Sequence, residues 1–406
     1  MYLTDTEKRM RDAEMGEPVR TAMEILMALG EIYGAEKLIP IQSAHVAGLS
    51  LKSHGLAGTG WAEDMANRGA RVCIPTTMNV IGVDRSRDLH LPQAWVKDQL
   101  RIEAAYERMG CLGISSCVPY YFGFVPRFQE HIAWAESSAV VFTNSVLGAR
   151  DNREAGPSAL ASGLTGRTPL YGLHLEENRR GDVLIKVSVP LTNLADYGAL
   201  GSYVGRIIGN RVPVFEKFQE PSIEDLVYLG AGLASSGGVA MFHAVGVTPE
   251  APTIESAFKG KKYEVLEITA KELEEGKQKL TSAKDRKADY VAIGCPHCSL
   301  NQLKELATLL QGRRVNKETT LWVHTNVAIK SLAKQLGYVQ VIEDAGAVVT
   351  QDLCTILGNP EALGFKTLAT NSPKMAFYAP GSNGLDVWYG SVEQCIETAL
   401  HGFWSA

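Results

Sequence analysis

Short apolar runs and amphipathic segments alternate through the second half of the chain, and this alternation limits the possible folds more than any other feature. Each segment typical of a buried strand is followed by one typical of a helix: 263–269 then 271–283, 289–294 then 299–312, and 319–325 then 328–337. Strand–helix alternation of this kind builds parallel sheets covered by helices. We therefore predict an α/β fold with parallel or mixed sheets, in which ligands bind beyond the carboxyl ends of strands.

The first half of the chain contains the same kinds of segment in a less regular order. Helices are expected where apolar residues recur at helical spacing and a glycine follows: 18–33, 61–68 and 99–109. Buried strands are expected at 71–77, 139–148 and 183–191. A charged stretch with two prolines, 205–225, separates the two halves. We expect an N-terminal α/β region, 1–215, and a C-terminal α/β region, 216–406.

The composition is that of a globular protein and excludes several other classes. Of the 406 residues, 45% are hydrophobic and 21% are charged, which excludes a disordered or fibrous chain. The net charge of −5 argues against a nucleic-acid partner, because such proteins usually carry a basic excess. No apolar run approaches the roughly 20 residues that span a bilayer, and the first residues lack the apolar stretch of a signal peptide. We expect a cytoplasmic protein with no membrane partner.

The cysteines are too scattered for a disulfide framework. There are seven, an odd number, in a long chain without an export signal. Cys73 lies in an expected strand and Cys395 on the apolar face of an expected helix, and we predict that both are buried core thiols. Cys111 and Cys298 fit either a core or a ligand role. The other three lie in loops: Cys117, Cys295 and Cys354.

The GCPHCS segment, 294–299, is the sharpest local motif. It follows an expected strand and precedes an expected helix, so its cysteines lie at a helix N-terminus, where backbone N–H groups favour a thiolate. Three interpretations are open: a redox-active pair, half of a zinc site, or one ligand of an iron–sulfur cluster. A four-cysteine zinc site needs a second close pair, which the sequence lacks. A cluster needs cysteines from other loops.

Cys117 in SSCVPYY and Cys354 in TQDLCTILG are suitable partners for such a cluster. Three cysteines can hold three irons of a [4Fe–4S] cube and leave the fourth iron free to bind a substrate hydroxyl and carboxylate. This is Lewis-acid chemistry rather than electron transfer. From these residues alone, a smaller iron–sulfur cluster or a single iron is equally compatible with the three cysteines.

Polar segments elsewhere supply candidate substrate-binding residues. Arg150 and Arg153 follow an expected strand, and arginine grips carboxylates and phosphates in bidentate fashion. APGSNG, 379–384, resembles a glycine-rich anion loop, with Lys374 before it and Ser382 within it. The remaining candidates are small polar side chains and one histidine near expected strand ends: Ser43, His45, Thr76, Thr77, Asn79, Asn144, Ser145 and Asn152.

Taken together, these segments resemble the large, catalytic subunit of the aconitase X family over nearly the whole chain. The resemblance is carried by KLIPIQSAHVAGLS, PTTMN, SSCVPYY, WAESSAVVFTNSVLGARDNREAGPSAL, LTGRTPLYGLHL, GCPHCS and QDLCTIL. It implies an aconitase-like iron–sulfur hydro-lyase with α/β domains around the cluster, and Cys117, Cys295 and Cys354 as the metal ligands. Two positions depart from the family's usual pattern. TTMNV stands where TTLNP is common, and DLC stands where DTC is common.

The resemblance also implies a choice between two activities. One is dehydration of (R)-5-phosphomevalonate to trans-anhydromevalonate 5-phosphate, a step of isoprenoid precursor synthesis, and the other is dehydration of cis-3-hydroxy-L-proline. SAHVAGLS and the unfused large chain resemble the archaeal two-subunit type, which favours the phosphorylated hydroxy acid. Arg150, Arg153 and Lys374 are then anion partners, and Ser382 is a candidate base that nearby cations would have to activate.

A second subunit follows from the same resemblance. In the family a small, swivelling subunit closes over the site and could supply the base, so we expect a heteromer whose large chain is inactive alone. Two other classes stay open: an electron-transfer or sensor protein with a four-cysteine cluster, and a non-catalytic zinc protein.

Overall fold

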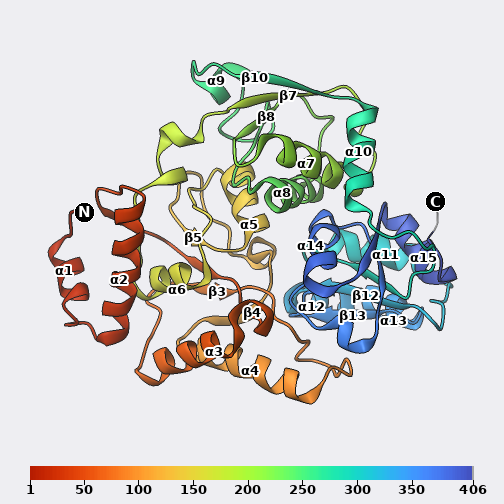
Figure 1. Ribbon diagram of the computed structural model, residues 1–406, viewed down its shortest axis with the longest axis horizontal. Helices are drawn as coiled ribbons and strands as arrows, with labels where there is room; N and C mark the ends of the chain where they lie inside the picture. Colours follow the sequence, from red (N-terminus) through yellow and green to blue (C-terminus); the bar gives the residue numbers. More distant parts are fainter. Residues whose placement is uncertain (405–406) are drawn as a thin grey trace.

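Three parallel sheets form the framework of the protein, and the computed structural model describes them within residues 1–404. In Figure 1 the second sheet and its helices lie at the top and the third at the right, with the first sheet between them and the N-terminal helices. Helices flank each sheet, as the strand–helix alternation predicts. The predicted α/β class is confirmed.

The first sheet has the strand order β4-β3-β2-β5, and all of its pairs are parallel. Its strands are β2 (Ala44–Val46), β3 (Thr76–Met78), β4 (Leu112–Ser115) and β5 (Ala133–Trp134). The helices of this part are α1 (Asp5–Arg11), α2 (Glu17–Ile32), α3 (Leu51–Asn67), α4 (Gln93–Arg108), α5 (Ser137–Phe142) and α6 (Gly156–Thr165). A separate antiparallel pair joins β1 (Leu38–Pro40) to β6 (Arg167–Pro169).

The second sheet has the order β10-β7-β8-β9 and is also parallel. It contains β7 (Val183–Val187), β8 (Pro213–Phe215), β9 (His243–Ala244) and β10 (Glu264–Ile268), with helices α7 (Leu194–Ile208), α8 (Ile223–Gly237), α9 (Ile254–Phe258) and α10 (Ala270–Leu280). Because β7 pairs with β10, strands from both sides of residue 215 share this sheet. The division into 1–215 and 216–406 stays a prediction.

The third sheet, of order β13-β12-β11-β14-β15, is parallel throughout. Its strands are β11 (Tyr290–Ile293), β12 (Thr320–Thr325), β13 (Val348–Gln351), β14 (Thr367–Thr370) and β15 (Asp386–Tyr389). Its helices are α11 (Leu300–Leu310), α12 (Val327–Gln335), α13 (Tyr338–Asp344), α14 (Pro373–Asn383) and α15 (Val392–His401). The alternating pattern read from the sequence over 289–337 corresponds to β11, α11, β12 and α12.

Several local predictions were wrong. The stretch 139–148 is not a strand: it forms the end of α5 and the π-helix η2 (Thr143–Leu147). Most of it is buried, and a short buried apolar run such as 139–142 does not distinguish a helix from a strand. APGSNG is not a loop, because it continues α14 as far as Asn383 despite Pro380 within it. The strand expected at 71–77 is reduced to β3, and Cys73 is exposed rather than buried.

Short 3₁₀ segments complete the chain: η1 (Pro119–Phe122), η3 (Gly172–His174), η4 (Glu176–Arg179) and η5 (Pro360–Leu363). Within residues 1–404, no helix has the length and apolar character that crossing a membrane requires.

Helices α7 and α8 pack with their backbones in contact at the middle of the molecule. A Cβ atom built on Gly201 would lie 2.2 Å from the carbonyl oxygen of Leu229, and one built on Gly232 would lie 2.4 Å from that of Gly198. Only glycine permits this approach. Since α8 also packs against α5 and α14, this contact helps to fix the first and third sheets relative to each other.

We expect Gly201→Ala to lower the free energy of unfolding by about 1–3 kcal/mol, because the backbone of α8 would have to move. Gly60→Ala is a suitable control: Gly60 lies on the exposed side of α3 with nothing within 4 Å of a built Cβ, so alanine should raise stability by about 0.5–1 kcal/mol. Thermal melts would compare the two. Equal melting temperatures would show that the α7–α8 contact is looser than described.

Candidate iron–sulfur site

The three cysteines predicted as metal ligands meet in one cavity of about 320 Å³. Each follows a strand at its carboxyl end: Cys117 after β4, Cys295 after β11 and Cys354 after β13. The first and third sheets thus face each other with their carboxyl ends across this cavity. The rest of its wall comes from the loops after β2, β3, β5, β11 and β13, from the start of α5 and from α14: Ala47, Gly48, Asn79, Val80, Ala135, Glu136, Ser137, Ser138, Pro296, Ile356, Leu357, Lys374, Tyr378 and Ser382.

The thiols are in polar surroundings although they are buried. A hydrogen bond from the Cys295 thiol and the N–H groups of Leu357 and Ile356 lower the pKa of Cys354, and the same contact raises the pKa of Cys295. Burial raises the pKa of Cys117, whose sulfur accepts a hydrogen bond from a backbone N–H at 3.2 Å. N–H donors directed at sulfur favour the thiolate that a metal requires.

The donor set fits an iron–sulfur cluster with one open position. Among residues 1–404, no other cysteine contributes to the walls of the cavity: Cys298 is buried in the separate core of the third sheet, and Cys111 packs in the core of the first. The described residues contain no group of three His, Cys, Asp or Glu side chains placed to hold one metal ion. Cysteines that each bind a different iron of a cluster do not have to converge on one point.

A buried ion pair forms the wall opposite the cysteines. Lys374, in the first turn of α14, contacts the carboxylate of Glu136, which caps α5, and donates to Ser137 Oγ at 3.1 Å. Burial alone would raise the pKa of Glu136, but the Lys374 ammonium outweighs it and lowers that pKa to about 2. For Lys374 burial acts in the opposite direction and would lower the pKa, but Glu136 and the Cys295 sulfur raise it. Both side chains are therefore charged at neutral pH.

A second layer supports Glu136. Asn79 Nδ2 donates to Glu136 Oε2 at 2.7 Å. Behind it His45, fully buried, has its Nδ1 atom 2.8 Å from Thr77 Oγ1. Burial lowers the pKa of His45 to about 4, so the ring is neutral. Two more predicted residues do not line the cavity. Thr76, in β3, donates to the carbonyl of Ile74, and Ser43, just before β2, accepts from Trp134 at 3.0 Å.

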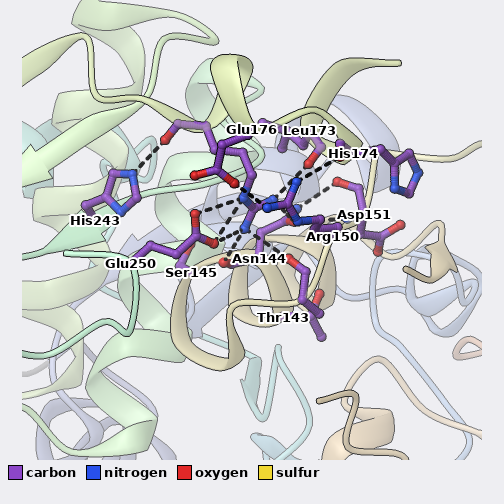
Figure 2. Close-up of polar contacts among 12 residues, drawn as sticks. Thr143, Asn144, Ser145, Arg150, Asp151, Leu173, His174, Glu176, His243 and Glu250 are labelled. Atoms are coloured by element: carbon purple, nitrogen blue, oxygen red, sulfur yellow. Dashed lines mark hydrogen bonds and ion pairs between the residues drawn. The ribbon is translucent and has the colours of Figure 1, made fainter. Parts of the chain in front are cut away.

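The arginine segment that the sequence suggested lies elsewhere, and its side chains have partners within the protein. Arg150 pairs with Glu176 and donates to the carbonyl of His174 at 3.0 Å (Figure 2). Arg153 donates to the carbonyl of Gly238 at 2.8 Å. The neutral residues Asn144, Ser145 and Asn152 bond to backbone groups of this part of the chain. None of the five lines the cavity.

This segment is organised by Arg179, which the sequence did not single out. Its guanidinium is 1% exposed, pairs with Glu250 and donates to Asn144 Oδ1 and to the carbonyls of Asn144, Ala149 and Leu173. Figure 2 labels Asn144, Leu173 and Glu250 among these acceptors. The network holds η2 and the loop after it, so this segment has a structural role here. Its substrate-binding role stays a prediction.

Glu136 is the residue of the cavity that sequence reasoning missed. It lies inside WAESSAVVF, where an acidic residue next to two serines before an apolar run is an N-cap signal. The sequence contained that signal, but it gave no sign that Glu136 contacts Lys374, which is 238 positions away.

Models of the aconitase X family match three consecutive parts of the chain: the first domain over residues 1–177, the second over 181–278 and the third over 288–401. Each part contains one of the three parallel sheets.

Curated relatives cover the chain almost completely. The phosphomevalonate dehydratase large subunit of Methanothermobacter thermautotrophicus is 44% identical over 96% of both chains, and that of Methanocaldococcus jannaschii is 42% identical over 98% of this chain and all of its own. The cis-3-hydroxy-L-proline dehydratase of Pseudomonas aeruginosa is 37% identical over 96% of this chain and 68% of its own.

A solved structure agrees with these sequence matches. The crystal structure of the holo-form of aconitase X from Thermococcus kodakaraensis superposes with a TM-score of 0.91 at 39% identity, over 98% of this chain and 100% of that one. The resemblance inferred from the motifs is confirmed, and the chain belongs to the aconitase X family.

Proposed function

We propose that this chain is the large subunit of a phosphomevalonate dehydratase, which removes water from (R)-5-phosphomevalonate to give trans-anhydromevalonate 5-phosphate. Four large subunits of that name are 40–44% identical over nearly their full length, which supports this assignment over hydroxyproline dehydration, whose relatives are 35–37% identical and longer than this chain. The observation that carries the proposal is the cavity in which three cysteines face a buried lysine.

The cofactor that fits these residues is a [4Fe–4S] cluster held by Cys117, Cys295 and Cys354. When bound, it supplies a Lewis acid that promotes departure of the substrate hydroxyl. The chain's own groups then bind and orient the substrate. Lys374 presents a cation to the cavity. An ammonium group is unfavourable at the N-terminus of a helix, where Lys374 lies, and the Glu136 carboxylate compensates for this. Glu136 and Asn79 fix where that cation points.

Removal of the substrate's α-proton needs a base. Ser382 lines the cavity near the C-terminal end of α14, and we keep it as the candidate on this chain. Arg150 and Arg153 would have to reach the phosphate from outside the cavity. A small subunit, implied by the "large subunit" names of the relatives, would close the site and could supply the base instead.

The substrate assignment is tested with the large and small subunits purified together without oxygen. We expect turnover of (R)-5-phosphomevalonate and none of cis-3-hydroxy-L-proline, and no turnover by the large chain alone. Dehydration of hydroxyproline only would contradict the choice of substrate. Full activity of the isolated large chain would contradict the need for a partner.

The set of ligands is tested by exchanging cysteines one at a time. Cys117→Ser should abolish iron and sulfide binding, whereas Cys298→Ser should retain both, because Cys298 is buried in another core. Iron and sulfide analysis with an absorption spectrum reads this out. Loss of iron in Cys298→Ser would instead favour a four-cysteine electron-transfer or sensor site.

The ion pair is tested by a double-mutant cycle. Lys374→Met leaves the buried Glu136 carboxylate unpaired and should cost about 3–5 kcal/mol of stability. Lys374→Met combined with Glu136→Gln should recover most of that stability. Because the cation is still missing, kcat/KM of the double variant should stay about 100-fold below that of the natural protein. A double variant with undiminished turnover would remove Lys374 from the substrate site.

A further inference from the structure

His297 lies between the three cysteine loops and contacts all of them. It belongs to the GCPHCS loop itself, between Cys295 and Cys298. Its imidazole ring contacts two groups: the hydroxyl of Ser116, which precedes Cys117, and the backbone carbonyl of Leu353, which precedes Cys354. We propose that His297 is the positioning residue that holds the three loops in register for the cofactor, an inference that rests on the iron–sulfur centre of the proposed function.

The geometry determines how each ring nitrogen is used. Nε2 is 3.0 Å from the carbonyl oxygen of Leu353 and must donate, because a carbonyl only accepts. In the neutral ring Nδ1 is then the acceptor, and Ser116 Oγ, 3.2 Å away, donates to it. Ser116 Oγ accepts in turn from the N–H of Val118 at 3.3 Å, so the chain of bonds spans both sides of Cys117.

The backbone of His297 acts on the cofactor ligand directly. Its N–H group donates to Cys117 Sγ at 3.2 Å. Hydrogen bonds to ligand sulfurs shift cluster potentials and stabilise the thiolate. The side chain therefore fixes the loops, and the main chain of the same residue reaches one of the sulfurs.

Water cannot replace these bonds. His297 is 2% exposed, Ser116 is 0% exposed and Leu353 is 1% exposed. The loops they join come from two different sheets, since Cys117 follows β4 of the first sheet and Cys354 follows β13 of the third. Removal of the ring would thus leave the buried Leu353 carbonyl without a donor and the buried Ser116 O–H without an acceptor at the point where the sheets meet.

Two variants test the positioning role. His297→Phe keeps a ring of similar size and loses both ring bonds. Ser116→Ala removes one hydroxyl, which donates to Nδ1 and accepts from the N–H of Val118. Groups that orient metal ligands typically contribute about 10–100-fold to metal affinity. We therefore expect cluster absorbance to disappear in air about 10–100-fold faster in His297→Phe, and by a smaller factor in Ser116→Ala. His297→Gln, which can still donate to Leu353, should recover part of the lifetime.

His243→Phe is the matched control. His243 is also 2% exposed and has one ring nitrogen, Nε2, 2.7 Å from a backbone carbonyl, that of Arg179, but it lies in β9 of the second sheet. It should lose thermal stability as His297→Phe does while the cluster lifetime and electron paramagnetic resonance spectrum stay unchanged.

The readouts separate this inference from the proposed function. If the cluster lifetimes and spectra of both His297→Phe and Ser116→Ala equal those of the natural protein, the positioning role is overturned. The proposed dehydratase function would not be affected by that result. A natural protein that holds its cluster but does not dehydrate phosphomevalonate would overturn the proposed function alone. If His297→Phe does not fold, Ser116→Ala decides, because it changes one hydroxyl.

Discussion

The structure depends on two parallel sheets that face each other with their carboxyl ends. All the loops that build the cavity leave a strand at that end, β2 to β5 on one side and β11, β13 and β14 on the other. The facing arrangement is held by the glycine-mediated α7–α8 packing and by Arg85, which pairs with the buried Asp352 carboxylate at 3.1 Å. Asp352 is two positions before Cys354, so this pair also anchors a cysteine loop.

Charge in the cavity follows from the same arrangement. A cluster with three thiolates would bring negative charge into a buried space. Lys374 is a cation in that space, and because it is already buried and paired with Glu136, no further group has to be desolvated. The carboxylate is fixed by Asn79 and by the start of α5. The ion pair is neutral as a whole, yet its ammonium group can still contact an anionic substrate.

The sequence predicted what depends on local chemistry. GCPHCS, expected between a strand and a helix start, ends at Ser299, which caps α11 with Gln302 as its reciprocal partner. The sequence was misleading where packing decides. The apolar run at the start of 139–148 suggested a strand although it is a buried helix, and Gly381 and Pro380 suggested a loop although α14 continues through them. Glu136 and Lys374 meet only through the fold, so no spacing could pair them.

The central claim is that three distant thiolates hold a cluster with one iron open to substrate. Mössbauer spectroscopy of ⁵⁷Fe-loaded large and small subunits, recorded with and without (R)-5-phosphomevalonate, tests it most directly. The account predicts one iron whose signal differs from the others and changes when the substrate is added. Four equivalent irons, unchanged by the substrate, would contradict it.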